Sequence, residues 1–299
     1  MIPALVLTAG LGTRLQPLST YRAKPALPIA GTPLIARMLR HLRNAGMTRV
    51  VLNLHHRADS ITRIVGDGSA FDLQVRYSWE TKVLGSAGGP ARAIPLLEAD
   101  RFLIVNGDMI TDVDVRALVR HHADTNALVT MAVVDGLPGY NGVIADERGI
   151  VSGFGRQPGA FHYIGVQVVN ASVFAGLDVD AVSETVHGIY PPLIASRPEA
   201  IRIFQSKASY FDIGSPRDYL DTARTIARRE GRPLDRGRDC TIAANASLVD
   251  TILWDRVRVG AGATLSECIV ADDVVIAEGA EFSRSTLIMR EDRIIATPF

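Results

Sequence analysis

Over about the first 135 residues, short β-branched apolar runs alternate with longer segments of helical period. This alternation is typical of βαβ units built around a parallel sheet. The runs best suited to buried strands are Ala4–Leu7, Val50–Leu54 and Phe102–Asn106. We therefore expect an α/β domain whose central strands lie parallel.

Two segments of this region have a clear helical period. In Pro33–Ala45 the apolar positions recur on one face, and Gly46 follows as a stop signal. A second helix is expected after Asp112, which is a candidate N-cap. The apolar residues spaced for burial in these helices are Leu34, Ile35, Met38, Leu39, Leu42, Val115, Leu118 and Val119.

From residue 127 the pattern changes to strand-like runs separated by Gly and Pro. Three runs predict additional, partly antiparallel strands that extend the sheet: Ala127–Val134, Val143–Ala145 and Tyr163–Val169. A last short strand is expected at Tyr210–Ile213 and a closing helix at Pro216–Arg229. The prediction for residues 1–230 is thus one α/β domain with a mixed, Rossmann-like sheet.

After an expected linker at Arg229–Asp239, the sequence repeats with a period of 17 residues. The apolar positions that share this period are Ile242, Val259 and Ile276; Leu248, Leu265 and Phe282; and Leu253, Val270 and Leu287. Within a unit these positions step by 6, 5 and 6, so each unit has three short faces. We predict a three-sided β-helix of about three coils over residues 239–290, against the alternative of three unrelated hairpins.

Charge and cysteine content narrow the classes of function. Lys plus Arg and Asp plus Glu both number 32 in 299 residues, without a basic run that would favour nucleic acid or an anionic membrane. Cys240 and Cys268 have no zinc-ligand spacing and favour a reducing compartment. Met1–Leu7 is short and lacks a basic leader, so we interpret it as a strand and not as a signal peptide. We expect a soluble, cytoplasmic protein.

The segment from Leu7 to Pro25 is the richest in candidate chemistry. Gly10 and Gly12 follow a buried strand, where the backbone can approach a triphosphate closely and present its N–H groups. Arg14 and Lys24 add positive charge. A purely structural turn is the alternative, because Gly-rich turns are common in α/β proteins. The lysine of a P-loop is absent, which argues against a mononucleotide kinase. Leu15 stands where GxGxxG has its third Gly, which argues against a dinucleotide-binding oxidoreductase.

The same segment resembles the opening motif of the sugar-1-phosphate nucleotidylyltransferases, close to GxGTRLxPLT followed by KPxxP. Three further stretches resemble motifs of this family in the same order: Leu84–Gly88 its LGTAG, Val105–Asp108 its NGD and Phe211–Pro216 its DIGTP. Many guanylyltransferases and adenylyltransferases of the family end in a left-handed β-helix. The resemblance is strongest to mannose-1-phosphate guanylyltransferases, and it implies such a tail after a Rossmann-like nucleotidyltransferase domain.

The reaction of this family joins a sugar 1-phosphate to a nucleoside triphosphate (NTP) and releases pyrophosphate. The attacking phosphate oxygen is already an anion, so alignment and electrostatic stabilisation replace a general base. The resemblance implies a Mg²⁺ cofactor held by Asp108 and Asp212. It makes Arg14, Lys24 and Asp108 the catalytic residues, with Arg14 on the leaving phosphates and Lys24 on the reacting phosphate.

The resemblance also implies two sets of binding residues. Nucleotide contacts are expected from Leu7, Ala9, Gly10, Gly12, Thr13, Gly85, Ser86 and Ala87. Sugar-phosphate contacts are expected from Gly142, Arg156 and Gly165. Relatives usually have Glu-Lys-Pro where this chain has Arg156-Gln157-Pro158. Arg156 would supply the positive charge one position earlier than the family Lys. Because Arg presents a rigid fork and Lys a compact point charge, the exchange is not neutral, and it leaves both the sugar and the turnover open.

Plain structural roles compete with several of these assignments. Asp108 could be a turn residue or helix cap, and Lys24 a solvated loop charge. The pairs His55-His56 and His121-His122 are expected to be structural, because neighbouring side chains point in different directions. Trp79 and Trp254 are expected to be packing residues.

The expected function is formation of a nucleotide sugar, with GTP and mannose 1-phosphate or a related sugar as substrates. UTP- or dTTP-dependent transfer is the alternative within the family. A non-catalytic regulatory relative would be expected to lose Arg14, Lys24 or Asp108, and all three are present. An acyltransferase is disfavoured by the few coils and by the absence of His after His187. We expect a homo-oligomer in which the tail contributes stacking and not chemistry.

Overall fold

The computed structural model describes residues 1–136, 142–234 and 236–299. Its contacts divide the chain into two units, which are described separately. The first comprises Met1–Gly10, Ala36–Ala58 and Val65–Phe211, and the second comprises Leu11–Ile35, Asp59–Ile64 and Asp212–Phe299. This grouping joins residues 11–35 to the tail, whereas the sequence predicts a boundary between residues 230 and 239.

A seven-stranded sheet forms the centre of the first unit, in the order β12-β8-β11-β6-β1-β4-β5. Its strands are β1 (Ala4–Leu7), β4 (Arg49–Leu54), β5 (Gln74–Trp79), β6 (Arg101–Asn106), β8 (Val129–Val134), β11 (His162–Asn170) and β12 (Ile201–Gln205). Only β11 runs antiparallel to its neighbours, while every other pair in this sheet is parallel. The predicted mixed sheet is confirmed.

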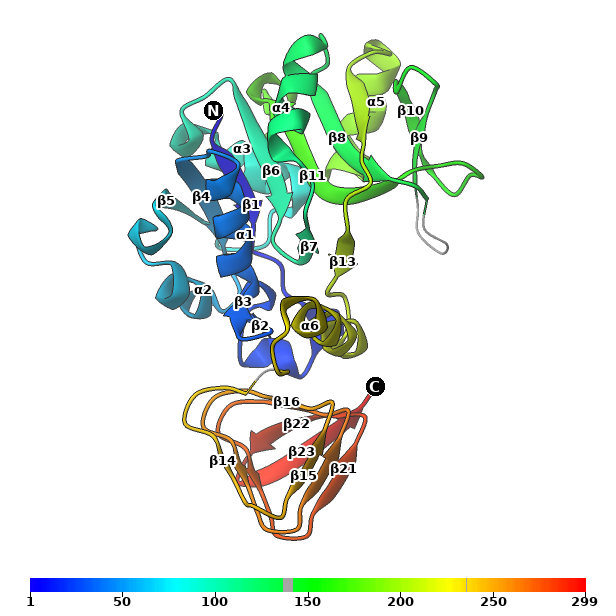
Figure 1. Cartoon of the computed structure of the whole chain (residues 1–299). Helices are drawn as coiled ribbons and strands as arrows, with labels where there is room; N and C mark the ends of the chain where they lie inside the picture. Colours follow the sequence, from blue (N-terminus) through cyan, green and yellow to red (C-terminus); the bar gives the residue numbers. More distant parts are fainter. Residues whose placement is uncertain (137–141, 235) are drawn as a thin grey trace. The chain divides into compact units, whose positions relative to one another are not determined.

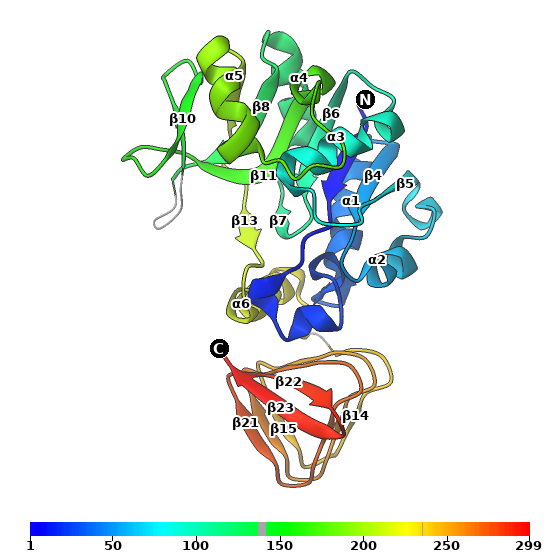
Figure 2. The same ribbon diagram turned by 180° about the vertical axis from the view of Figure 1, so that it is seen from behind.

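Helices cover both faces of this sheet (Figures 1 and 2). The helices that include residues of the first unit are α1 (Leu34–Asn44), α2 (Ala58–Val65), α3 (Gly85–Leu97), α4 (Val115–Asp124) and α5 (Tyr190–Ser196). Figure 2 shows α3 and α5 on one face, and Figure 1 shows α1 and α4 on the other. Fully buried residues such as Leu5, Ile104 and Tyr190 fill the core under α3 and α5, which explains why the central strands are apolar on both faces.

Three predictions for single residues in this unit can be compared with the structure. The cap of α4 is Asp114, whose carboxylate accepts from Ala117 N at 2.9 Å, so the prediction for Asp112 was wrong. Asp112 instead accepts from Ser209 N at 2.7 Å. Trp79 is 57% exposed on the edge strand β5, so its predicted packing role was also wrong. His122 is buried between Thr130 and Asn170, which supports a structural role.

Short elements complete the first unit. β9 (Gly142–Ala145) and β10 (Val151–Gly155) pair as an antiparallel hairpin. β7 (Met109–Thr111) follows β6 after a two-residue turn and pairs with β13 (Tyr210–Asp212). Among the described residues, no helix has the length and apolar character needed to cross a lipid bilayer.

The tail in the second unit is a three-sided β-helix, drawn end-on in Figure 1 from yellow to red. Its strands are β14 (Thr241–Ile242), β15 (Ser247–Val249), β16 (Ile252–Leu253), β17 (Arg258–Val259), β18 (Thr264–Ser266), β19 (Ile269–Val270), β20 (Val275–Ile276), β21 (Glu281–Ser283), β22 (Ser285–Arg290) and β23 (Arg293–Pro298). Parallel pairs such as Ile242↔Val259 and Leu248↔Leu265 repeat the 17-residue offset on each face. The predicted coil register is confirmed, and an antiparallel β22–β23 pair follows the last coil.

The rest of the second unit lies on the tail. Ser215 is the N-cap of α6 (Pro216–Glu230), and its hydroxyl accepts from Asp218 N at 3.2 Å. Residues 11–35 contain short 3₁₀ turns and the pair β2 (Pro28–Ile29) and β3 (Thr32–Pro33). Trp254 is fully buried, and its indole N–H donates to the Tyr219 hydroxyl at 3.1 Å. Residue 235 of the expected linker lies outside the described residues.

Candidate active site

Three parallel strands of the first unit bring polar groups to one edge of the sheet. Leu7, Asn53 and Asn106 stand in register at the carboxyl ends of β1, β4 and β6. Ligands of open α/β sheets bind at this edge. Leu7 is half-buried, Ala9 is buried and Gly10 is exposed, so the predicted nucleotide residues that follow β1 pass from the core to the surface.

A buried hydrogen-bond network fixes this edge. Thr8 N donates to Asn53 Oδ1 at 2.6 Å, and Asn53 Nδ2 donates to Glu80 Oε1 at 2.7 Å. The second oxygen of Glu80 accepts from Leu84 N at 3.0 Å, immediately before α3. A buried carboxylate is stable only when it is hydrogen-bonded. Asn53 and Glu80 therefore tie the loop after β1 to the start of α3, a role that the sequence analysis missed. The available signal was a polar residue, Asn53, inside an apolar strand.

The predicted nucleotide residues Gly85, Ser86 and Ala87 form the first turn of α3. Gly85 has a φ of +81°, and a Cβ there would lie 2.5 Å from the carbonyl oxygen of Ser183, so only Gly fits. The Ser86 hydroxyl donates to Glu184, and Ala87 N donates to Ser183 O at 2.9 Å. Segment 183–185 thus fixes the conformation of this turn. The assignment of the three residues to the nucleotide stays a prediction.

Asp108 lies half-buried in the turn between β6 and β7, beyond the carboxyl end of β6. Gly165 lies in the irregular part of β11 with a φ of +74°, and a Cβ there would lie 3.1 Å from that of Asn106. The structure therefore places Gly165 beside the end of β6, near the carboxylate predicted to be catalytic. Gly142 begins β9, and Arg156 is exposed just after β10, so these two belong to the hairpin.

Tyr163 adds a buried phenol to this region. Its hydroxyl is inaccessible to solvent and has no hydrogen-bond partner among the described residues. Burial raises the pKa of Tyr163 well above its usual value, and the charges of Tyr190, Tyr210 and Asp108 act in the same direction. The phenol therefore stays neutral at physiological pH.

The second unit contains the other predicted catalytic residues. Gly12 has a φ of +63° and opens a 3₁₀ turn that carries Thr13 and Arg14. Arg14 Nη2 lies 3.9 Å from Asp212 Oδ2, and Lys24 Nζ lies 3.7 Å from Asp212 Oδ1. Three residues that the sequence analysis singled out therefore meet in one cluster, and their catalytic and metal-binding roles stay predictions.

Burial distinguishes the two cations of this cluster. Lys24 is 9% exposed, which excludes the alternative of a solvated loop charge. The Arg14 side chain is 70% exposed and accessible to a ligand. A buried Lys requires a partner, and Asp212 supplies one. Gly214 makes room for the cluster, because a Cβ there would lie 2.9 Å from both Arg14 Nη1 and Asp212 Oδ2.

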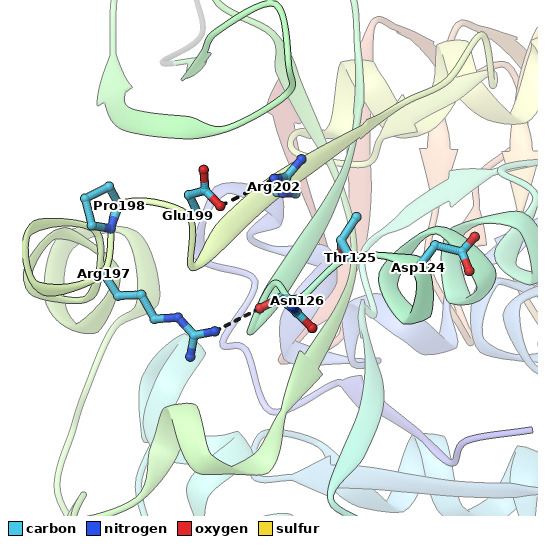
Figure 3. A pocket seen from close by; sticks show the side chains of 7 residues that line it. All are labelled: Asp124, Thr125, Asn126, Arg197, Pro198, Glu199 and Arg202. Carbon is cyan, nitrogen blue, oxygen red and sulfur yellow. Dashed lines mark hydrogen bonds and ion pairs between the residues drawn. The ribbon is translucent and has the colours of Figure 1, made fainter.

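A separate cavity of about 540 Å³ lies at the opposite edge of the first unit's sheet (Figure 3). Its lining residues are Asp124, Thr125, Asn126, Arg197, Pro198, Glu199 and Arg202. They lie just before β8 and around the start of β12, at the amino ends of these strands. Arg197 donates to Asn126 O, and Arg202 pairs with Glu199. None of the predicted site residues lines this cavity, which lies at the edge opposite the carboxyl ends of the strands, where ligands of open α/β sheets bind.

Comparison with known proteins agrees with these motifs. The family model described as "Nucleotidyl transferase" matches residues 3–229. A mannose-1-phosphate guanylyltransferase of Mycobacterium tuberculosis is 29% identical over 97% of this chain and 83% of that protein. An N-acetylmuramate alpha-1-phosphate uridylyltransferase of Neisseria meningitidis serogroup B is 44% identical over 115 residues, 38% of this chain and 50% of that protein.

Solved structures show the same fold. HddC from Yersinia pseudotuberculosis superposes with a TM-score of 0.66 and 23% identity over 76% of this chain and 100% of that chain. Its complex with GMP-PN gives a TM-score of 0.64 at 24% identity, over the same shares of the two chains. The family match covers both the edge of the sheet and the Arg14–Lys24–Asp212 cluster. The chain belongs to the nucleotidyl transferase family, among relatives that are sugar-1-phosphate nucleotidylyltransferases.

Proposed function

We propose that the protein transfers a nucleotidyl group from an NTP to a sugar 1-phosphate and releases pyrophosphate. The observation that carries this proposal is the pairing of two cations, Arg14 and Lys24, with one shared carboxylate, that of Asp212. These residues stand in segments that match the motifs of the family. One buried and one accessible cation suit substrates that carry several phosphate charges.

The mechanism depends on alignment and charge. A sugar 1-phosphate is anionic at neutral pH, so the chain needs no base to create the nucleophile. Lys24, fixed by burial, would hold the reacting phosphate in place. Arg14 would bind the β- and γ-phosphates with its planar guanidinium and stabilise the charge that grows on the leaving pyrophosphate.

Mg²⁺ is the cofactor that we propose for this reaction. The predicted ligands Asp108 and Asp212 supply carboxylate oxygens, and Mg²⁺ commonly takes one or two carboxylates with water and substrate phosphates as the remaining ligands. The donor set therefore fits the ion. When bound, the ion would neutralise phosphate charge.

We propose GTP and mannose 1-phosphate, or a related sugar 1-phosphate, as the substrates. Support comes from the guanylyltransferase of M. tuberculosis, whose similarity extends over nearly the whole chain. UTP-dependent transfer is the second candidate, favoured by the higher local identity to the N. meningitidis uridylyltransferase. Arg156, which stands one position before that of the Lys in the family triplet, would contact the sugar phosphate.

Replacing Lys24 tests the proposed role of the cluster. Lys24→Gln should lower kcat/KM for pyrophosphate release by about 10²-fold or more, as expected when a group aligned with the reacting phosphate is lost. Lys207→Gln is the matched control, because Lys207 is exposed in the loop between β12 and β13. If both variants kept wild-type turnover, the cluster would not be the phosphate site.

A further inference from the structure

The β-helix holds the segment that carries the predicted catalytic cations. Arg22 lies between Arg14 and Lys24 in the sequence and is directed at the tail, not at Asp212. Its Nε and Nη2 donate to the two carboxylate oxygens of Asp272 at 3.0 and 2.5 Å. Nη2 also donates to Asp255 Oδ2 at 3.0 Å. One guanidinium therefore joins two acidic residues of the tail.

The two acidic residues are equivalent positions on consecutive coils. Asp255 and Asp272 are 17 residues apart, and Asp255 N donates to Asp272 Oδ1 at 2.9 Å. Two carboxylates this close repel each other, and the shared Arg22 guanidinium offsets that repulsion. The side chains of Arg22, Asp255 and Asp272 are only 19%, 15% and 15% exposed. Water therefore screens these ion pairs less than it would at the surface.

Two further contacts tie the same segment to the tail. The Arg22 guanidinium carbon lies 4.9 Å from the ring centroid of the buried Trp254, which is cation–π geometry. The Tyr21 hydroxyl donates to Met289 O on β22. Residues 11–25 contain only 3₁₀ turns of three residues each, so their own secondary structure does little to fix them.

We propose that the β-helix positions the catalytic cations: Asp255 and Asp272 hold Arg22, and Arg22 holds the segment that presents Arg14 and Lys24. This inference rests on the proposed function. Arg22 is a positioning residue, since it contacts Asp255 and Asp272 and reaches Lys24 through only one intervening residue. A misplacement of about 1 Å in an aligned group can cost roughly 10²-fold in rate. Loss of the Arg22 contacts should therefore be visible in turnover.

The test compares Arg22→Met, Asp272→Asn and the double variant with the full-length wild type. Asp273→Asn is the matched control, because Asp273 is the next residue on the same coil and its carboxylate forms an exposed ion pair with Arg256. Two quantities are measured on each protein. They are kcat and KM for pyrophosphate release, and the hydrogen-exchange rate of amides in residues 11–25.

We expect Arg22→Met to lower kcat/KM at least tenfold and to speed exchange in residues 11–25, while Asp273→Asn changes neither. The double variant should lose no more kcat/KM than Arg22→Met alone, because both substitutions break the same contact between Arg22 and Asp272. Additive losses, or a drop in melting temperature with unchanged kcat/KM and unchanged exchange, would overturn the proposal. If Arg22→Met fails to fold, Asp272→Asn still provides the test, because it is the milder change and leaves the contact between Arg22 and Asp255 in place.

The two proposals fail separately. A wild type that is inactive with every substrate pair would refute the proposed function. Amide exchange would then still decide whether Arg22 orders residues 11–25, because it requires no turnover. Unchanged exchange in both Arg22→Met and Asp272→Asn would refute the positioning role.

Discussion

Replacing Trp254 by Phe tests how the tail is joined to the rest of the second unit. The indole is fully buried and donates to the Tyr219 hydroxyl, which in turn donates to Pro28 O at 2.8 Å. This chain of contacts links the β-helix to α6 and to the strand β2. Trp254→Phe keeps an aromatic ring beneath Arg22 but removes the N–H donor and part of the buried surface.

The cost can be worked from these contacts. The substitution removes two buried ring carbons, at about 0.8 kcal/mol for each buried carbon group. The lost hydrogen bond adds about 1 kcal/mol. The free energy of unfolding should therefore fall by about 2–3 kcal/mol, which corresponds to roughly 5–10 °C in melting temperature for a unit of this size.

The chain supplies its own control, since Trp79 is the other of its two Trp residues and is 57% exposed. Trp79→Phe should change the free energy of unfolding by less than about 0.5 kcal/mol. It also leaves Trp254 as the single Trp reporter of the second unit. Urea unfolding is followed by circular dichroism in both variants and by Trp254 fluorescence in Trp79→Phe. Equal stability of the two variants would refute the reasoning.

Three further predictions concern catalysis, pH and the tail. Asp108→Asn should abolish turnover while circular dichroism and the melting temperature stay close to wild type, because Asp108 lies in a half-buried turn outside the core; unfolding would contradict the assignment. Burial lowers the pKa of His122, so the unfolded state takes up a proton near pH 6.5 that the folded state resists. As the pH is lowered from about 6.5, the free energy of unfolding should therefore decrease by up to roughly 1.4 kcal/mol per pH unit, and less steeply in His122→Gln. Urea titrations at several pH values measure this slope, and equal slopes in the wild type and His122→Gln would exclude His122 as its origin. Deleting residues 240–299 should lower kcat/KM as well as the melting temperature, because Arg22 loses both of its aspartate partners. Sedimentation of the full-length and truncated proteins tests the predicted self-association. Full activity of the truncated protein would contradict the positioning role.

The parts of the fold that follow from spacing could be predicted from the sequence. The 17-residue period predicts the coil register because equivalent residues of stacked coils must pair. α3 was not predicted, because its sequence contains Gly88, Gly89, Pro90 and Pro95. Local propensity disfavours a helix there. Packing of its small residues, including the fully buried Ala87, against the sheet overrides that propensity.

The candidate site also contains residues that sequence spacing predicts and residues whose roles depend on tertiary contacts. Arg14, Lys24 and Asp212 could be identified because motifs record residue types at fixed spacing. Glu80 and Arg22 could not, because their roles depend on partners 27 and 250 residues away. The 17-residue repeat contained a usable signal, since Asp255 and Asp272 place two acidic residues at one position of successive coils. Such a stack predicts a bridging cation, but the sequence does not say which one.

A substrate panel tests the central claim most directly. Purified protein is incubated with each of GTP, UTP, dTTP and ATP, paired with mannose 1-phosphate, glucose 1-phosphate or N-acetylmuramate 1-phosphate, with and without Mg²⁺. Pyrophosphate release and the nucleotide sugar are both quantified. The proposed function predicts equimolar pyrophosphate and nucleotide sugar only when NTP, sugar 1-phosphate and Mg²⁺ are all present, with GTP and mannose 1-phosphate among the best pairs. Absence of product with every pair would contradict it.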